Sequence, residues 1–541
     1  GGVAKEERYH WPLAAAGERA LIARAVGGCG AHNAMLYVRA LPSDFLAWNA
    51  TGGGDGAEDP WSYDRMLPLY MELETYEDAD AGGRAVAAAT PWYRGAAGPM
   101  VTAAQPPHVD RVAPLFMASC EAAGLAAVAD GFNLPNRGKR AGCGYYQFNI
   151  RDGVRDGAAA AVLAPAILGE KKLPNLEVIT GATVGRVLMR KKEGRAAIAT
   201  GVEYFDRHDK TLKSVRLVTG TDTHVVLAGG AIMTPQILAN SGIHEHGEMA
   251  QVPGVGKDLQ DHPAIGIKFR LAPHLAATAP STYALTDQIR EYARAVEARR
   301  RRRKEGGGDA APPPPLGIFG SPGLSAGSFL VSPYAAHEPP PHTNEPDLQV
   351  TAFPRVTEPH LEGTVGAVDF EEMLITIALL RPEARHVVGL NTDPDVPFHA
   401  RYPSVDVAPG RAKYLTDRDE ERLAWGLEEV RRIARQPPLS DSIAGETSPG
   451  ADVTGDALNT FVREKSTVNS HWVGSCRMGP PDDAGAVVDA HLRVRGTEGL
   501  RIVDASVIPH IPNGNVHSTV CAVAARGVDI MLGREEMTMP K

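Results

Sequence analysis

The sequence has little cysteine, no long apolar run and no excess of positive charge, and each shortage excludes a class of protein. Its five cysteines, an odd number without any CxxC spacing, match neither a disulfide framework nor a zinc site and favour a reducing compartment. No stretch reaches the roughly 18 uninterrupted apolar residues of a membrane-spanning helix. The net charge of −9 argues against a nucleic-acid-binding surface. We therefore expect a soluble protein that neither binds nucleic acid nor spans a membrane.

Length and composition indicate two packed domains. A chain of 541 residues is too long for one simple core, while 43% apolar and 22% charged residues are ordinary for a soluble globular protein. One stretch differs, because the basic run RRRRRK at 299–304 leads into EGGGDAAPPPP. Glycine and polyproline cannot build a core, so we expect a disordered insert at about 299–345. A nucleic-acid or lipid contact is the alternative for the basic run, and the acidic chain disfavours it.

Apolar spacing predicts several regular elements. Residues 61–75 should form a helix that begins after Ser62, because apolar side chains recur there at helical spacing. The 176–204 stretch is typical of β-structure, and 223–243 is typical of a buried strand, a glycine turn and a helix, which make a βα unit. Another helix is expected at 416–436, begun by Thr416 or Asp417.

Four glycine-containing stretches follow one another along the chain. Each alone is a weak signal, because glycine turns before helices are common. They are ARAVGGCGAHNAMLYVR (23–39), AGGAIMTPQILANSGI (228–243), PGVGKDLQDH (253–262) and a block over 469–532 that contains NSHWVGSCRMGP and IVDASVIPHIPNGNVHS. In this order, and with PWSYDRMLPLY at 60–70, they resemble the glucose–methanol–choline (GMC) family of FAD-dependent oxidoreductases. The resemblance runs from about residue 10 to residue 532, apart from the insert.

The resemblance implies a two-domain α/β (α+β) fold. An FAD-binding, Rossmann-like domain, incomplete at its N-terminus, would be assembled from 1–54, 171–264 and 466–541. A substrate-binding domain with an antiparallel sheet and helices would come mainly from 265–465. The 55–170 segment would contribute to both domains.

The resemblance also implies which residues hold FAD. Gly27 and Gly28 would let backbone amides approach the pyrophosphate at a helix N-terminus. At His32 two alternatives stay open: covalent attachment of the flavin through its 8α-methyl carbon, as in members with a similar GGCSSHN stretch, or a non-covalent contact. The implied cofactor-binding residues are Gly27, Gly28, His32, Asn33, Ala34, Val184, Gly229, Asp504, Ala505, Asn515 and Val516.

One part of the family pattern is missing. Family members begin with a βαβ unit that carries GxGxxG and binds the ADP half of FAD, and this sequence contains no GxGxxG. The first residue is Gly rather than Met. We therefore expect a processed, trimmed or incomplete N-terminus, with any targeting segment lost. A separate polypeptide is one source that would supply the ADP-binding unit.

Two histidines fall at the catalytic positions that the resemblance implies. His471 in NSHWVGSC would be the base that takes the hydroxyl proton of an alcohol, and His517 in GNVHS would orient that hydroxyl. The reaction would be FAD-dependent oxidation of a primary or secondary alcohol to an aldehyde or ketone, with hydride transfer to flavin N5. Histidine suits the base because its pKa in water is near 6.5. His510 matches no catalytic position, and we interpret it as structural.

Three other functions stay open beside alcohol oxidation. Light-driven fatty acid decarboxylases of this family lack the histidine at the His471 position and carry cysteine where this chain has Leu380, so the sequence disfavours that activity. A flavin-containing lyase without a redox step keeps the histidines. A non-catalytic structural descendant that has lost FAD binding would agree with the missing ADP-binding unit. Bound-flavin absorbance, and its bleaching by an alcohol, separate these functions.

Overall fold

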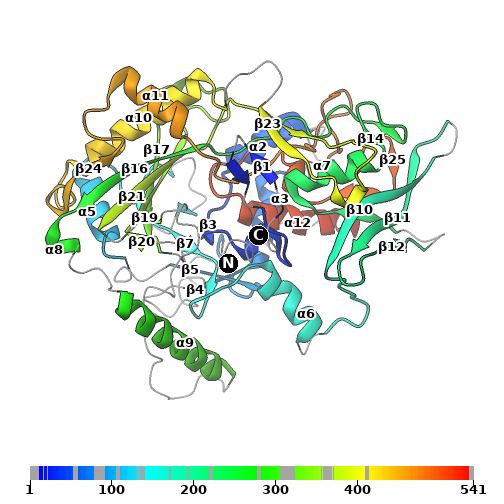
Figure 1. Ribbon diagram of the computed structural model, residues 1–541, viewed down its shortest axis with the longest axis horizontal. Coiled ribbons are helices and arrows are strands. Elements are labelled where there is room, and N and C mark those ends of the chain that lie inside the picture. Colours follow the sequence, from blue (N-terminus) through cyan, green and yellow to red (C-terminus); the bar gives the residue numbers. More distant parts are fainter. Residues whose placement is uncertain are drawn as a thin grey trace.

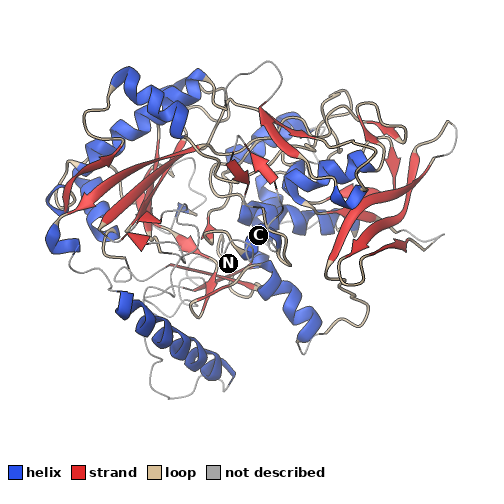
Figure 2. Ribbon diagram, viewed as in Figure 1, coloured by secondary structure: helices blue, strands red, loops and turns tan. Residues whose placement is uncertain are grey.

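The computed structural model of the chain combines helices and strands in two parts that lie side by side (Figure 1, Figure 2). The left-hand part in these views holds a large sheet with helices on its outer face, and the right-hand part holds shorter strands among helices. The predicted two-domain α/β fold is confirmed. The structure describes residues 11, 13–15, 18–20, 22–52, 59–77, 92–104, 110–128, 132–133, 140–169, 172–191, 194–218, 223–276, 282–304, 323–354, 356–357, 368–369, 371–407 and 414–534.

The right-hand part is built around a parallel pair of short strands. β13 (Val225–Leu227) pairs with β26 (Leu500–Ile502), and α7 (Gly230–Asn240) follows β13 after a glycine turn. This arrangement confirms the βα unit predicted at 223–243. The helix predicted at 61–75 is confirmed as α3 (Tyr63–Leu73), with Ser62 at its N-cap position. α3 lies against α12 (His517–Met531), so distant segments of the chain share one core.

An antiparallel sheet forms the outer edge of the right-hand part (Figure 1). Its strands β10 (Ala182–Arg190) and β11 (Ala197–Asp206) account for most of the β-structure predicted at 176–204. β12 (Thr211–Arg216) extends the sheet beside β11, and β25 (Thr497–Glu498) adds to β11 in parallel. Buried residues alternate along β10 and β11, as expected for strands with one face on a core.

The left-hand part is a six-stranded sheet in which each neighbouring pair is antiparallel. Apolar side chains of the sheet and of the helices above it form one core. The predicted helix at 416–436 is confirmed, and it begins with a capping box between Thr416 and Asp419. In sheet order the strands are β24 (Ile443–Ser448), β16 (Ala264–Leu271), β21 (Glu372–Leu379), β18 (Leu348–Phe353), β17 (Ala326–Leu330) and β6 (Gly142–Tyr145), and the helices are α5 (Ala113–Ala122), α10 (Asp417–Ala434) and α11 (Gly455–Lys465).

The predicted disordered insert at 299–345 is wrong at both of its ends. Its first residues belong to α9 (Thr282–Lys304), because arginine and lysine are good helix formers that extend a helix already begun. Near its other end, β17 is fully buried between β18 and β6. The composition of the whole segment, rich in glycine and proline, gave no indication of the short apolar strand within it. Residues 305–322 lie outside the described residues.

The remaining elements are short. Two small four-stranded sheets have the orders β2-β1-β23-β22 and β3-β7-β5-β4, and three further pairs are β8–β9, β14–β15 and β19–β20. The strands are β1 (Leu13–Ala15), β2 (Glu18–Ala20), β3 (Leu36–Tyr37), β4 (Glu74–Glu77), β5 (Met100–Ala104), β7 (Gln147–Phe148), β8 (Ile150–Arg151), β9 (Val154–Arg155), β14 (Ile243–His244), β15 (Ala250–Gln251), β19 (Val356–Thr357), β20 (Val368–Asp369), β22 (His386–Gly389) and β23 (Ser404–Val407), and the short helices are α2 (Pro42–Gly52), α6 (Ala164–Leu168) and α8 (Pro273–Ala276).

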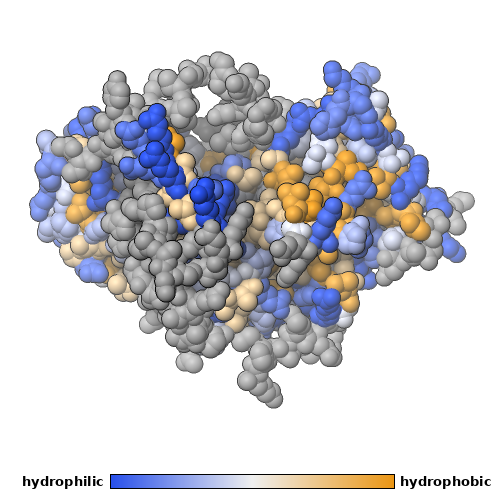
Figure 3. Space-filling model, turned by 90° about the horizontal axis from the view of Figure 1, so that it is seen from below, coloured by the Kyte–Doolittle hydropathy of each residue, from blue (hydrophilic) through white to orange (hydrophobic). Residues whose placement is uncertain are grey.

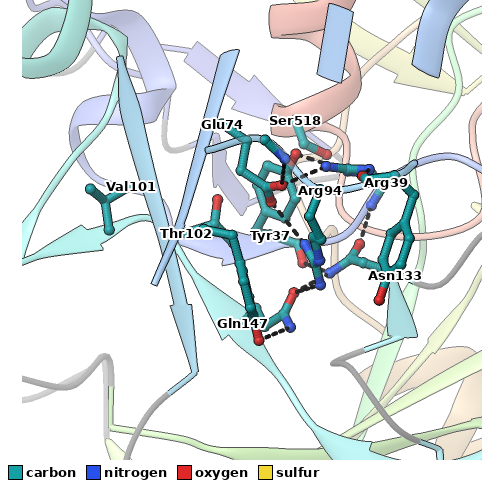
Figure 4. Close-up of polar contacts among 12 residues, drawn as sticks. Tyr37, Arg39, Glu74, Arg94, Val101, Thr102, Asn133, Gln147 and Ser518 are labelled. Atoms are coloured by element: carbon teal, nitrogen blue, oxygen red, sulfur yellow. Dashed lines mark hydrogen bonds and ion pairs between the residues drawn. The ribbon is translucent and has the colours of Figure 1, made fainter. Parts of the chain in front are cut away.

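A buried ion cluster braces the segment after β3 (Figure 4). Glu74 accepts hydrogen bonds from Arg39 and Arg94, each at 2.8 Å. The Glu74 side chain is 1% exposed and the two arginines are 2% exposed, so the three charges satisfy one another away from water. The Ser518 hydroxyl donates to the Val38 carbonyl. The cluster therefore anchors the chain segment against which the start of α12 is held.

Part of the molecular surface is apolar (Figure 3). Within the ranges given above, no helix is both long and apolar enough to cross a membrane. Seen from below, apolar surface gathers over the right-hand part of the molecule (Figure 3). The exposed apolar side chains between residues 168 and 179 are Leu168, Leu173, Leu176, Val178 and Ile179.

Candidate active site

His471 lies in a loop that a buried carboxylate holds in shape. Asp261 accepts the backbone N–H of His471 on Oδ1 at 2.6 Å, and those of Asn469 and Ser470 on Oδ2 at 2.8 and 3.2 Å. Ser470 has a φ of +58°, a region that non-glycine residues rarely occupy. The three bonds to Asp261 stabilise this unusual turn and so fix the direction of the His471 side chain.

Replacing Asp261 with alanine should lower the free energy of unfolding by about 1–3 kcal/mol, because backbone N–H groups lose their acceptor. Asp261 is 2% exposed, so water does not readily replace the lost carboxylate. Chemical denaturation measures the loss. The matched control is Asp395→Ala at an exposed aspartate, which should change stability by less than about 0.5 kcal/mol. Equal denaturation midpoints for the two variants would contradict the bracing role of Asp261.

The His471 ring lies between two polar side chains. Its Nδ1 is 3.0 Å from Nδ1 of His262, and the rings meet edge to face at 84°. On the other side, Nδ2 of Asn515 is 3.3 Å from His471 Nε2. Asn469 Nδ2 makes a longer contact of 3.4 Å with Nδ1. Both ring nitrogens of His471 are therefore engaged, with Nε2 directed toward the segment just before α12.

Burial keeps both histidines of this pair neutral. It lowers the pKa of His471 from 6.5 to about 4. Burial first, and the neighbouring His471 second, hold the pKa of His262 well below its usual value. Asp261 beside them has a pKa raised by burial to about 7, against the lowering effect of the backbone N–H groups that it accepts. His471 therefore keeps one ring nitrogen unprotonated at neutral pH, as a general base requires.

His517 is the first residue of α12 and packs on the glycine turn near the N-terminus. A Cβ placed on Gly30 would lie only 2.8 Å from Cε1 of His517, so a side chain at position 30 would displace the His517 ring. Nε2 of His517 is 3.9 Å from Sγ of Cys521. Burial, and then Arg155, lower the pKa of His517. Among the described residues, no hydrogen bond joins His471 to His517, so the structure places the two predicted catalytic histidines on separate sets of contacts.

The glycine turn exposes backbone held in a left-handed conformation. Gly27 and Gly28 have φ values of +93° and +56°, and a short 3-10 helix, Gly28–Ala31, follows. The space where a Cβ of Gly28 would lie is open to beyond 4 Å. Bare backbone with open space at a helix start fits the approach of a pyrophosphate. Arg155 donates to the side chain and to the carbonyl of Asn33, which ties the turn to β9.

The other predicted cofactor-binding residues lie along one core. Asp504 Oδ2 accepts the backbone N–H of Gly230 at 2.8 Å and the Thr234 hydroxyl at 2.6 Å, so it joins the turn after β13 to β26. Gly229 precedes α7 as its N-cap. Val184, Ala505 and Val516 pack, partly buried, against the core of the right-hand part. His32 and Ala34 are exposed beside the glycine turn.

Sequence reasoning missed two residues that contact His471. His262 and Asp261 both fall in PGVGKDLQDH, a stretch that was identified only as a glycine motif. The adjacent Asp and His at its end were a usable signal, because such pairs often orient a catalytic group. Asn515 was predicted to bind the cofactor, which stays a prediction, and its amide also lies against the His471 ring.

Known proteins resemble this chain along most of its length. Two family models, both described as GMC oxidoreductase, match residues 13–264 and 402–524. The chain is 28% identical over 556 residues to the chloroplastic fatty acid photodecarboxylase of Chlamydomonas reinhardtii. This match covers 97% of this chain and 81% of that protein. It is also 28% identical over 548 residues to mitochondrial choline dehydrogenase of Homo sapiens, covering 98% of this chain and 80% of that protein.

A solved structure extends the comparison to the fold. Formate oxidase of Aspergillus oryzae RIB40, solved in a study of its FAD modification, superposes with a TM-score of 0.76 at 17% identity and covers 98% of this chain and 89% of that chain. At this identity the likeness shows the fold alone. None of these matches gives support to a separate polypeptide as the source of an ADP-binding unit.

Proposed function

Since the chain belongs to the GMC oxidoreductase family, we propose that it oxidises a primary or secondary alcohol, with Nε2 of His471 as the base that takes the hydroxyl proton. At the level of the family, the protein is an FAD-dependent oxidoreductase acting on CH–OH donors. The observation that carries the proposal is the half-buried His471, which its low pKa keeps neutral and whose Nε2 lies beside Asn515 just before α12.

The proposed chemistry divides between the cofactor and the chain. FAD supplies the acceptor for the hydride that leaves the alcohol carbon. The chain supplies the base, because His471 takes the hydroxyl proton on Nε2 and so makes loss of hydride from the carbon easier. His517 is proposed to orient the hydroxyl group from the opposite direction, at the junction of α12 and the glycine turn.

We propose that the right-hand part binds FAD and that the left-hand sheet forms the substrate domain. The glycine turn at Gly27 and Gly28 is the proposed pyrophosphate contact, since its bare backbone fits that group. Asp504 and Gly229 would hold the next part of the cofactor, because they meet where β13 and β26 end. In open α/β sheets, ligands bind at the carboxyl ends of the strands.

The two alternatives at His32 are separated by acid precipitation. A covalently bound flavin stays with the denatured pellet, whereas a non-covalent one leaves its yellow colour in the supernatant. The variant His32→Ala is the matched control. The His32→Ala substitution moves the yellow colour from the pellet to the supernatant only if His32 forms the covalent bond to the flavin.

Anaerobic titration with alcohols tests the proposed function. The purified protein should be yellow, and at least one alcohol from a panel of choline, benzyl alcohol and 1-butanol should bleach it. A lyase would keep its colour, and a structural descendant without FAD would be colourless from the start. Either result would contradict the proposal.

The depressed pKa of His471 predicts an acid limb at unusually low pH. Because the base must be unprotonated, kcat/KM should stay level down to about pH 5 and fall through a pKa of about 4. A solvent-exposed histidine would instead give a limb near 6.5. Stability should follow the same direction: neutral His471 favours the folded state above about pH 6.5, and this contribution is lost as pH falls toward 4.

Asp261 is the group that complicates this profile, because its carboxyl contacts the His471 backbone and its pKa is about 7. Asp261→Asn removes that titration and leaves the histidine in place. The limb near pH 4 should therefore persist in Asp261→Asn. A wild-type acid limb near pH 6.5 that persists in this variant would contradict a buried neutral base.

A further inference from the structure

A chain of hydrogen bonds determines which nitrogen of His471 carries a proton. It begins at Tyr146, whose hydroxyl donates to the Val350 carbonyl at 2.8 Å, so its oxygen accepts from Gln349 Nε2 at 3.2 Å. The same Gln349 nitrogen is 3.0 Å from Asn515 Oδ1. Asn515 must therefore turn its Nδ2 donor toward His471 Nε2, at 3.3 Å. A donor facing Nε2 means that Nε2 holds a lone pair.

The proton of neutral His471 then lies on Nδ1, which faces His262. The two Nδ1 atoms are 3.0 Å apart. Two ring nitrogens at this distance require one N–H and one lone pair. His262 Nδ1 is therefore the acceptor, and the proton of His262 lies on its Nε2.

Asn469 is the contact that would favour the opposite assignment. Its Nδ2 is 3.4 Å from His471 Nδ1, the longest polar contact of the ring. The Asn469 side chain is exposed, and a half-turn of its amide places Oδ1 there instead. With Oδ1 in that position, Asn469 also accepts from the Nδ1–H. The Asn515 amide has no equivalent freedom, because Gln349 selects its oxygen.

The far side of His262 agrees with a proton on Nε2. This nitrogen is buried, and within the described part of the chain it has no partner at hydrogen-bond distance. The backbone carbonyls of Leu380 and Pro512 nevertheless act on the ring in the direction that favours its protonated form. Nearby carbonyls stabilise an N–H and oppose a lone pair. These carbonyls therefore favour a neutral His262 with its proton on Nε2.

We propose that His262 is a positioning residue that holds His471 in the tautomer whose Nε2 is the base. This inference rests on the proposed function, because it assigns a role within the same reaction. As Nε2 of His471 takes the hydroxyl proton, Nδ1 keeps its own proton and the ring becomes positively charged. The Nδ1–H bond to His262 is then charge-assisted and stronger than before. His262 gains and loses no proton, so the proton balance of the reaction is unchanged.

Two variants at position 262 distinguish a hydrogen-bond acceptor from a side chain that only fills the space. His262→Leu fills similar space without an acceptor, and it should lower the rate constant of anaerobic flavin reduction by about 10–100-fold, the size of effect seen when the partner that orients a histidine ligand is lost. His262→Asn places an amide oxygen near the former Nδ1 and should recover most of that loss. The alcohol Kd should stay unchanged in both. Equal rates for His262→Leu and wild type would overturn the proposal.

Nitrogen-15 NMR of the holoenzyme labelled in histidine gives a readout that does not depend on turnover. The His471 signals are assigned by their loss in His471→Ala. The expected spectrum shows a proton on Nδ1 and none on Nε2, with a mixed or reversed tautomer in His262→Leu. A proton on Nε2 of wild-type His471 would overturn the proposal. If no alcohol reduces the flavin while the Nδ1–H tautomer is observed, the proposed function fails and only the assignment of the tautomer by His262 stands.

Discussion

Replacing His471 with alanine should lower the rate constant for reduction of the flavin by an alcohol by about 10²–10⁴-fold, the usual contribution of a general base. The side chain is half-buried, burial lowers its pKa to about 4, and its Nε2 lies beside Asn515. The hydroxyl proton would otherwise have to leave without an acceptor. Anaerobic stopped-flow measurement of the flavin absorbance gives the rate constant directly.

The control for this variant is His246→Ala, at an exposed histidine remote in sequence from the candidate site. It should react at the wild-type rate. Both variants should remain yellow, because no predicted cofactor contact is removed. Reduction of His471→Ala within a few-fold of wild type would contradict its assignment as the base.

Removing the shared carboxylate of the buried ion cluster should have the largest effect on stability. Glu74→Ala leaves Arg39 and Arg94 buried without their common partner, which should lower the free energy of unfolding by about 3–5 kcal/mol. The Gly95 backbone N–H also loses its acceptor. Denaturant titration of the purified protein measures the change.

The matched control is a half-exposed ion pair on the outer sheet of the right-hand part. Glu203→Ala breaks the contact with Arg186 at 3.1 Å, where both side chains are partly in water, and should cost about 0.2–1 kcal/mol. A loss in Glu74→Ala no larger than that in Glu203→Ala would show that the cluster does not hold this segment. Because Val38 is held to Ser518 at the start of α12, lower flavin content in Glu74→Ala is a secondary expectation.

The elements that local sequence patterns determine were predicted well. The strand, glycine turn and helix at 223–243 form a βα unit because apolar residues fill the strand and the glycines allow the turn. The helix after Ser62 and the capped helix at 416–436 follow from apolar spacing and from N-cap chemistry. In these segments the intrinsic helix or strand preference agrees with the pattern of burial, so the sequence alone predicts the element.

The elements that depend on distant partners were missed. β17 is a short strand within a segment of biased composition, and it is stable because β18 and β6 pair with both of its edges. Its partner β6 comes from a remote part of the chain, which a local pattern does not reveal. The prediction for the basic run relied on composition. It therefore missed that arginine and lysine, with their high helix propensity, continue α9.

The candidate site shows the same division. Family motifs pointed to His471, but its depressed pKa arises from burial that only the folded chain provides. His262 and Asp261 approach His471 from more than two hundred residues earlier in the sequence. The Gln349–Asn515 contact joins the left-hand sheet to the segment before α12. Such contacts across the two parts of the molecule are fixed by tertiary packing and leave no local signal.

Anaerobic bleaching of the flavin by an alcohol deuterated at the hydroxyl-bearing carbon tests the central claim most directly. The experiment uses the fastest alcohol of the panel, in its protonated and deuterated forms, and follows the absorbance of the holoenzyme. Alcohol oxidation predicts that both forms bleach the flavin and that the deuterated form does so several-fold more slowly. A flavin that dithionite reduces but that stays oxidised with every alcohol, in either isotopic form, would contradict the account.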